Sequence, residues 1–170
     1  MDVELTIYEL ADAEELALKA NNPNIARYLT DGFPSPYSLE DALSFIEKFS
    51  SQNPIQVFLI KVNGEIAGGI GIHPQNDIMR LNAELGYWVA EDMWGYGIAT
   101  KAITQMVRYG FENFNITRIY ARPFGSNIAS QRVLEKCGFE LEARIEQNII
   151  KNGIVEDELI YAIRKENLPT

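Results

Sequence analysis

Cysteine and histidine are nearly absent from this sequence, which has one of each, Cys137 and His73, among 170 residues. A lone cysteine cannot form an internal disulfide, and this pair leaves too few ligands for a Cys/His zinc site. Glycine and proline are also few, at 12 and 7 residues, which excludes a collagen-like or low-complexity chain. We therefore expect a globular protein with no bound metal, in a reducing compartment.

Positive charge and long apolar runs are also scarce. The chain has 15 Lys and Arg against 24 Asp and Glu, a formal net charge of −9, which disfavours a broad surface for phosphate backbones. No stretch approaches about 18 uninterrupted apolar residues, and residues 1–10 carry three acidic side chains and no basic segment. We expect no nucleic-acid partner, no membrane segment and a cytoplasmic location.

The hydrophobic residues, 46% of the chain, follow strand and helix periods that predict one domain over residues 1–170. The predicted strands are 3–10, 55–62, 65–72, 81–89, 117–122, 139–151 and 154–164, and the predicted helices are 11–21, 39–49, 98–111 and 127–136. The dipeptides Asn63-Gly64 and Asn152-Gly153 predict tight hairpin turns. This order of elements predicts an α/β (α+β) fold in which helices cover a mixed sheet.

A loop with spaced glycines follows the predicted strand 81–89. Gly95 and Gly97 allow successive backbone N–H groups to converge just before the helix that begins at Ile98, and such a place suits a phosphate. The P-loop ending Gly-Lys-Ser/Thr is absent, and Thr100 stands where the dinucleotide fingerprint needs glycine or alanine. Taken alone, the pattern is equally typical of a structural turn.

A second motif, Asn127 to Phe139, favours the phosphate interpretation. The segment Trp94-Gly95-Tyr96-Gly97-Ile98-Ala99 resembles the pyrophosphate loop of the GNAT acyl-CoA N-acyltransferases, and residues 127–139 resemble their Asn-x-x-Ser/Ala…Glu-Lys-x-Gly-Phe segment. The resemblance covers nearly the whole chain and is closest to the branch of ribosomal-protein N-terminal acetyltransferases. It implies a mostly antiparallel, twisted sheet of about seven strands, splayed in the middle and flanked by about four helices. It also implies acetyl-CoA as cosubstrate and no metal.

The resemblance further implies the residues that bind this cosubstrate. Pantetheine amides would bond to backbone groups of Trp88 to Ala90, and the thioester carbonyl would lie near the N–H of Val89 or Ala90. The pyrophosphate would bind the N–H groups of residues 95–100, and Asn127 would hold the pantetheine arm. The implied cofactor-binding residues are Trp88, Val89, Ala90, Gly95, Tyr96, Gly97, Ile98, Ala99, Thr100 and Asn127.

Two residues are candidates for proton transfer. Many members of the superfamily carry a tyrosine where Leu134 stands, as the acid that protonates the leaving thiolate, and the resemblance implies Ser130 as its substitute. A serine bonded to helix backbone is the alternative interpretation. Glu84 is the candidate base, acting through water. A solvated strand glutamate is the alternative there, and Glu91 and Asp157 are further candidates for the base.

We expect direct transfer of an acetyl group from acetyl-CoA to a primary amine, and a monomer or homodimer. The resemblance implies a protein N-terminal α-amine as the preferred acceptor. Such an amine needs little help from a base, since roughly one in five to ten is already neutral at pH 7, against about one in 2,500 lysines. Acetylation of a small polyamine or aminoglycoside is the alternative. The acidic net charge would favour a cationic acceptor of either kind, the N-terminus of a basic protein or such a small amine. A non-catalytic acyl-CoA-binding module is a further alternative, and a nucleotide-dependent oxidoreductase is the least favoured.

Overall fold

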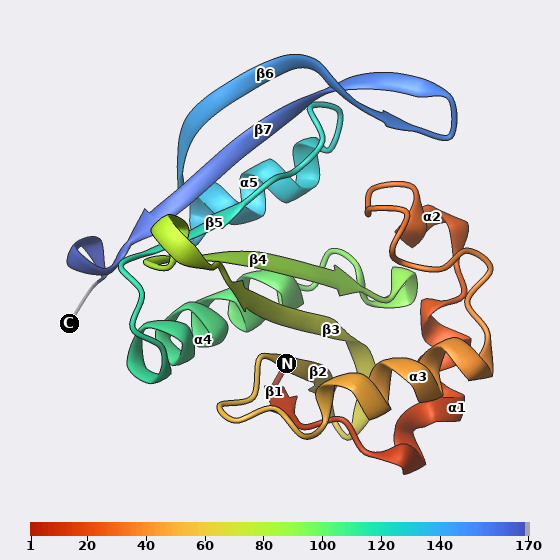
Figure 1. Ribbon diagram of the computed structural model, residues 1–170. Coiled ribbons are helices and arrows are strands. Elements are labelled where there is room, and N and C mark those ends of the chain that lie inside the picture. Colours follow the sequence, from red (N-terminus) through yellow and green to blue (C-terminus); the bar gives the residue numbers. More distant parts are fainter. Residues whose placement is uncertain (169–170) are drawn as a thin grey trace. The chain divides into compact units, whose positions relative to one another are not determined.

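The computed structural model describes residues 1–168 as a seven-stranded sheet with five α-helices (Figure 1). The strand order is β1-β2-β3-β4-β5-β7-β6. The strands are β1 Val3–Thr6, β2 Val57–Val62, β3 Glu65–Pro74, β4 Asn82–Val89, β5 Arg118–Ala121, β6 Glu140–Lys151 and β7 Ile154–Arg164. The helices are α1 Ala13–Ala20, α2 Pro23–Ala26, α3 Leu39–Phe49, α4 Ile98–Asn113 and α5 Ile128–Lys136.

The pairing of the strands confirms a mixed and mostly antiparallel sheet. Strands β1 and β2, β2 and β3, β5 and β7, and β6 and β7 pair antiparallel, whereas β4 and β5 pair in parallel. Both predicted hairpin turns are confirmed. Asn63 and Gly64 have φ values of 52° and 83°, and Asn152 and Gly153 have 52° and 78°. Positive φ at both central residues matches the right-handed twist of the two strands that each turn joins.

The chain divides into two compact units. Unit 1 comprises Met1–Gly71 and Tyr87–Ala102, and unit 2 comprises Ile72–Gly86 and the chain from Ile103 onward. The strands β3 and β4 and the helix α4 therefore each contribute residues to both units.

The core of unit 1 lies where α1 and α3 pack on β2 and β3. Its fully buried side chains include Leu16, Ile46, Leu59 and Ile66. The predicted start of α3 is confirmed, because the Ser38 hydroxyl accepts from the backbone N–H of the third helical residue and forms a capping box. These helices therefore bury one apolar stripe each against the sheet.

The core of unit 2 contains the predicted apolar face of α4. Ile103, Met106, Val107, Gly110 and Phe111 of this helix are all buried. At Gly110, an added Cβ would lie 2.8 Å from Cδ1 of Ile72 and 3.1 Å from Cδ1 of Ile119. A glycine at this point therefore lets the helix backbone pack closely on β3 and β5.

Two local predictions are wrong. The strand predicted over residues 3–10 ends at Thr6, because Glu9 and Asp12 form a reciprocal capping box that begins a 3₁₀ turn at Leu10. The predicted strand 65–72 continues to Pro74, so His73 is an exposed strand residue and not a loop residue.

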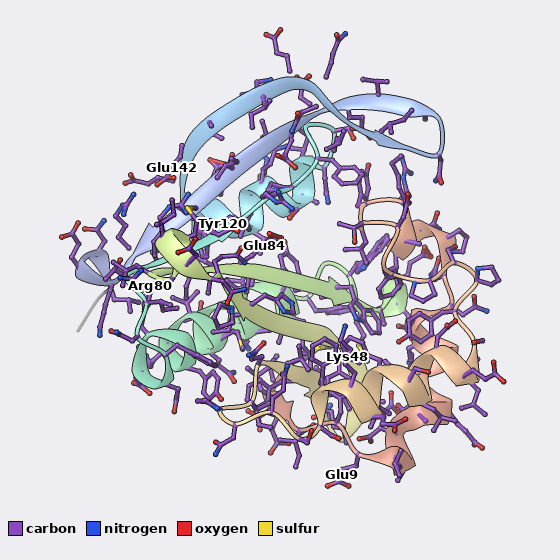
Figure 2. The ribbon with its side chains drawn as sticks, viewed as in Figure 1. Glu9, Lys48, Arg80, Glu84, Tyr120 and Glu142 are labelled. Carbon is purple, nitrogen blue, oxygen red and sulfur yellow. The ribbon has the colours of Figure 1, made fainter. Side chains whose placement is uncertain are left out.

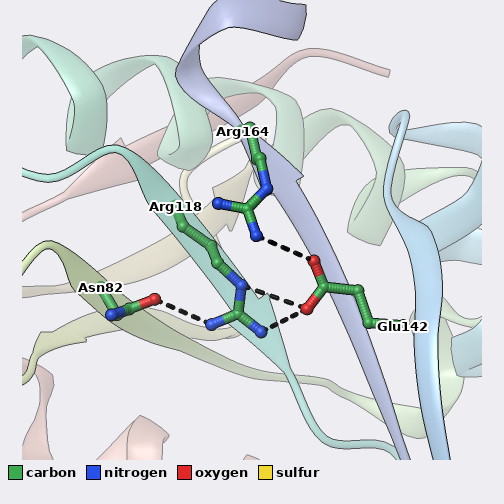
Figure 3. Close-up of polar contacts among 4 residues, drawn as sticks. All are labelled: Asn82, Arg118, Glu142 and Arg164. Carbon is green, nitrogen blue, oxygen red and sulfur yellow. Dashed lines mark hydrogen bonds and ion pairs between the residues drawn. The ribbon is translucent and has the colours of Figure 1, made fainter. Parts of the chain in front are cut away.

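A polar cluster in unit 2 joins four strands (Figure 3). Arg118 donates to Oδ1 of Asn82 at 2.8 Å and to Oε1 of Glu142 at 2.6 Å, while Nη2 of Arg164 lies 3.5 Å from Oε2 of Glu142. The hydrogen bonds from Arg118 are the main cause that lowers the pKa of Glu142, and the charges of both arginines act in the same direction. Because Arg118 and Arg164 are direct partners in the β5–β7 register, one carboxylate compensates two adjacent cations.

Candidate active site

The loop before α4, in unit 1, contains two glycines with left-handed backbone and open space beside them. Gly95 and Gly97 have φ values of +84° and +74°, in the left-handed region that favours glycine. A Cβ built on either glycine would meet no atom within 4 Å. The helix begins at Ile98, directly after this loop, and its first N–H groups lack intrahelical acceptors. The loop and the helix start can therefore accept an anion such as a pyrophosphate on backbone donors.

A hydrogen bond from Trp94 joins the start of this loop to the end of β4. Its indole Nε1 donates to the carbonyl oxygen of Val89 at 2.8 Å. The backbone N–H of Ala90 donates to the carbonyl oxygen of Ala67 at 2.7 Å. The expectation that Ala90 offers a free N–H is therefore wrong, because this donor is already engaged within unit 1. Since successive backbone groups point to opposite sides of a strand, the N–H of Val89 points away from β3.

A pair of glycines in β3, which the sequence analysis missed, supports the end of β4. A Cβ on Gly68 would lie 2.1 Å from the carbonyl oxygen of Trp88, and a Cβ on Gly69 would lie 2.7 Å from the indole nitrogen of Trp88. The two backbones therefore approach more closely than any other residue type would allow. The Trp88 ring in turn contacts Phe33, with a centroid distance of 6.0 Å. Adjacent glycines within a predicted strand were the available signal.

Asn127 and Ser130 lie together at the start of α5 in unit 2. Asn127 is the N-cap of the helix, and its Oδ1 accepts from the backbone N–H of Ser130 at 3.2 Å. The cap uses the side-chain oxygen of Asn127 and leaves the NH₂ group out of this bond. It also uses the backbone of Ser130 and not the hydroxyl. Both polar groups that the resemblance assigns to the site are therefore outside the capping interaction.

Glu84 lies on β4 directly opposite Tyr120 of β5 in the parallel register, and Figure 2 shows both side chains. Its Oε1 is 3.3 Å from Nε of Arg122, and its side chain is 29% exposed. Burial is the main cause that raises the pKa of Tyr120, and the charge of Glu84 and a hydrogen bond with its carboxylate act in the same direction. Glu84 is therefore a partly covered, paired carboxylate and not a solvated strand residue.

The other candidates for the base have structural partners. Oε1 of Glu91 accepts from Nδ2 of Asn24 at 2.5 Å, which ties the segment after β4 to α2. Asp157 accepts from the backbone N–H of Gln147 at 3.0 Å and from Nε of Arg144 at 2.9 Å. These bonds, the one from Gln147 first, lower the pKa of Asp157. Gln147 has φ +50° and lies where the β6–β7 register shifts, so Asp157 stabilises a bulge.

Among the described residues, 1–168, no helix is both long and apolar enough to span a bilayer. Nor does that part of the chain bring three or more His, Cys, Asp or Glu side chains together in a group that could hold a metal ion.

A seven-stranded mixed sheet of this order, with a glycine loop before α4, is the fold that solved structures of acetyltransferases share. The family model described as the acetyltransferase (GNAT) domain matches residues 2–140. The chain therefore belongs to the GNAT acetyltransferase family and is an acetyl-CoA-dependent N-acetyltransferase.

Curated relatives match over most of their length. The N-acetyltransferase YoaA of Bacillus subtilis is 33% identical, covering 91% of this chain and 88% of the relative. The putative ribosomal N-acetyltransferase YdaF of B. subtilis is 27% identical, covering 96% and 91%. Spermidine N(1)-acetyltransferase of Escherichia coli K12 is 26% identical, covering 89% and 80%.

Solved structures of acetyltransferases share the fold. RimJ of Mycobacterium smegmatis in complex with CoA-disulfide has a TM-score of 0.85 at 25% identity, covering 99% of this chain and 84% of that chain. The microcin C7 self-immunity acetyltransferase MccE in complex with acetyl-CoA and AMP has a TM-score of 0.81 at 28% identity, covering 96% and 92%. The predicted fold class and the predicted cosubstrate are thus confirmed.

Proposed function

We propose that the enzyme acetylates the N-terminal α-amine of a protein. The observation that carries this proposal is the similarity, over 96% of the chain, to a relative named as a putative ribosomal N-acetyltransferase. We further propose that residues 1–170 act as one acetyltransferase domain, since the family model spans most of the chain.

The loop of unit 1 would hold the pyrophosphate of acetyl-CoA. Backbone N–H groups of Gly95 to Thr100 would donate to the phosphate oxygens, which is consistent with the left-handed glycines and the open space beside them. A side chain is not needed as a donor there. Acetyl-CoA, when bound, supplies the acetyl group as an activated thioester.

The end of β4 would orient the acyl group. Trp88 and Val89 would offer backbone groups to the pantetheine arm, as a neighbouring strand does. Because Ala90 donates to Ala67, we assign the carbonyl-binding role to the N–H of Val89 alone. Such a donor stabilises negative charge that develops on a carbonyl oxygen.

The start of α5 would supply the remaining contacts. The NH₂ group of Asn127 would donate to the pantetheine arm, while its Oδ1 keeps the helix capped. The hydroxyl of Ser130 would protonate the leaving thiolate, since the superfamily's tyrosine position is occupied by the fully buried Leu134.

Glu84 would accept the proton of the amine, directly or through water. A single carboxylate that relays a proton suits an acceptor that needs little deprotonation. An α-amine with a pKa of about 7.7 to 8.0 is such an acceptor, whereas lysine at about 10.4 is not. The chemistry of Glu84 thus supports the α-amine over a polyamine.

The test is a thiol-release assay with acetyl-CoA and a panel of acceptors. We expect the highest kcat/KM with peptides that have a free N-terminal amine and whose lysine side chain is blocked by acetylation. Preference for spermidine would favour the polyamine alternative, which the similarity to a spermidine acetyltransferase supports. Thiol release with none of the acceptors, combined with tight CoA binding, would favour a non-catalytic acyl-CoA-binding module.

A further inference from the structure

The side chains around Glu84 form a chain of contacts that continues across three strands of unit 2. Arg118 and Tyr120 are two residues apart on β5 and therefore share one face of the sheet. The guanidinium carbon of Arg118 lies 4.9 Å from the centroid of the Tyr120 ring. This is a cation–π distance, and it restrains the ring.

The far end of this chain of contacts is itself fixed. Two nitrogens of Arg118 donate to Oε1 of Glu142, at 2.6 and 3.2 Å, and a third donates to Oδ1 of Asn82. The side chain of Arg118 is only 15% exposed. A guanidinium with all three nitrogens engaged cannot swing away, so the aromatic ring beneath it is held in one place.

The near end of the chain of contacts is the carboxylate of Glu84. Tyr120 is its direct register partner, so the phenol and the carboxylate lie side by side on one face of the sheet, where the hydroxyl can donate to the carboxylate. Arg122, two residues beyond Tyr120 and directly after the end of β5, reaches Oε1 of Glu84. The phenol of Tyr120 on β5 and the guanidinium of Arg122 directly after it therefore both lie beside one carboxylate on β4, and Figure 2 shows Glu84 and Tyr120 on these neighbouring strands.

We propose that Tyr120 is a positioning residue for Glu84: the ring is held by Arg118, and the hydroxyl, together with Arg122, fixes the carboxylate in the orientation that accepts the proton of the acceptor amine. This inference rests on the proposed function of Glu84 as the base. Tyr120 does not exchange a proton itself. Its effect on the reaction passes through Glu84, so removal of the hydroxyl matters only while Glu84 is present.

The test is a double-mutant cycle with Tyr120→Phe and Glu84→Gln. The phenylalanine keeps the ring and its contact with Arg118, so the fold should persist, with an unchanged urea midpoint and an unchanged calorimetric affinity for CoA. We expect Tyr120→Phe to lower kcat about tenfold, the size of one hydrogen bond to a charged group, with an unchanged KM for acetyl-CoA. In the Glu84→Gln background, Tyr120→Phe should have no further effect on kcat.

The matched control is Tyr161→Phe. Tyr161 lies on the neighbouring strand β7 and pairs with Ala121 of β5. Its side chain therefore lies on the face of the sheet opposite to that of Tyr120, and the Tyr161→Phe variant should keep the wild-type kcat. Equal loss from Tyr120→Phe in both backgrounds, or no loss in either, would overturn the positioning role alone. An unchanged kcat in Glu84→Gln by itself would overturn the base role and, with it, the positioning role.

Discussion

The loop of unit 1 and the β4–β5 face of unit 2 are built in opposite ways. The loop, residues 94–100, relies on backbone groups and on two left-handed glycines, with no charged side chain before Lys101. The β4–β5 face relies on side chains that the strand register brings together, Glu84 with Tyr120 and Asn82 with Arg118. A site made of backbone is sensitive to any added side chain, whereas a site made of side chains is sensitive to the loss of single polar atoms.

The largest expected effect is on CoA binding, and it tests the loop of residues 94–100, which would bind phosphate through its backbone N–H groups. Gly97→Glu should abolish CoA binding, because the new side chain and its negative charge would enter the space where the pyrophosphate binds. Far-UV circular dichroism should stay near that of the wild type, and isothermal titration calorimetry with CoA should show no binding.

Gly64→Glu is the matched control for this loop variant. Gly64 also has a positive φ, +83°, and open space around it, but it lies in the β2–β3 turn. The two variants therefore share the added charge and the backbone strain. Wild-type affinity in Gly97→Glu, or equal loss in both variants, would contradict the assignment of the loop.

The next effect tests the side chains at the start of α5. Ser130→Ala keeps the backbone N–H that Asn127 caps, so α5 should remain intact. If the hydroxyl protonates the thiolate, kcat should fall by about 10² or more, with a modest change in the affinity for acetyl-CoA. Steady-state kinetics and calorimetry measure the two quantities.

Ser126→Ala is the control for this position. The hydroxyl of Ser126 donates to Oε1 of Glu156 just before the helix, so its removal also deletes one hydroxyl hydrogen bond. We expect nearly wild-type kcat in this control. Wild-type turnover in Ser130→Ala would contradict its role as the acid.

The smallest effect tests the polar cluster behind the β4–β5 face. The lowered pKa of Glu142 means that its ion pairs stabilise the fold above its ordinary pKa of about 4.3 and are lost as pH falls through the lowered value. Because the side chain is 34% exposed, Glu142→Gln should lower the free energy of unfolding at pH 7 by less than about 1 kcal/mol. Urea unfolding at pH 7 and at pH 3 measures this.

Glu140→Gln, an exposed substitution on the same strand, should change the free energy of unfolding little at either pH. The loss of unfolding free energy in Glu142→Gln should shrink as the pH falls from 7 to 3, because protonation of the wild-type carboxyl removes its ion pairs. If Glu142→Gln lost the same unfolding free energy at pH 7 and at pH 3, Glu142 would act through packing and not through its charge.

The contrast between the loop of unit 1 and the β4–β5 face of unit 2 also explains which features could be predicted from the sequence. The spaced glycines of the loop, the Asn-Gly turns and the apolar face of α4 are local patterns, and the structure confirms the elements that they predict. The contacts of Glu84 were not predictable, since Tyr120 of β5 and Arg122 just after it lie more than 30 residues away in the sequence. Their meeting depends on the β4–β5 register, which no local period determines. The bond from Ala90 to Ala67 depends in the same way on a pairing between strands.

The most direct test of the α-amine mechanism is the pH dependence of kcat/KM for the wild type and Glu84→Gln with the best peptide acceptor. If Glu84 relays the proton of an α-amine, the variant should be most impaired below pH 7 and should recover substantially by about pH 9, where the amine is neutral without help. A lysine or polyamine acceptor would not recover so early, because its pKa is near 10.4. A ratio of wild type to variant that stays constant from pH 6 to pH 9 would contradict the role of Glu84.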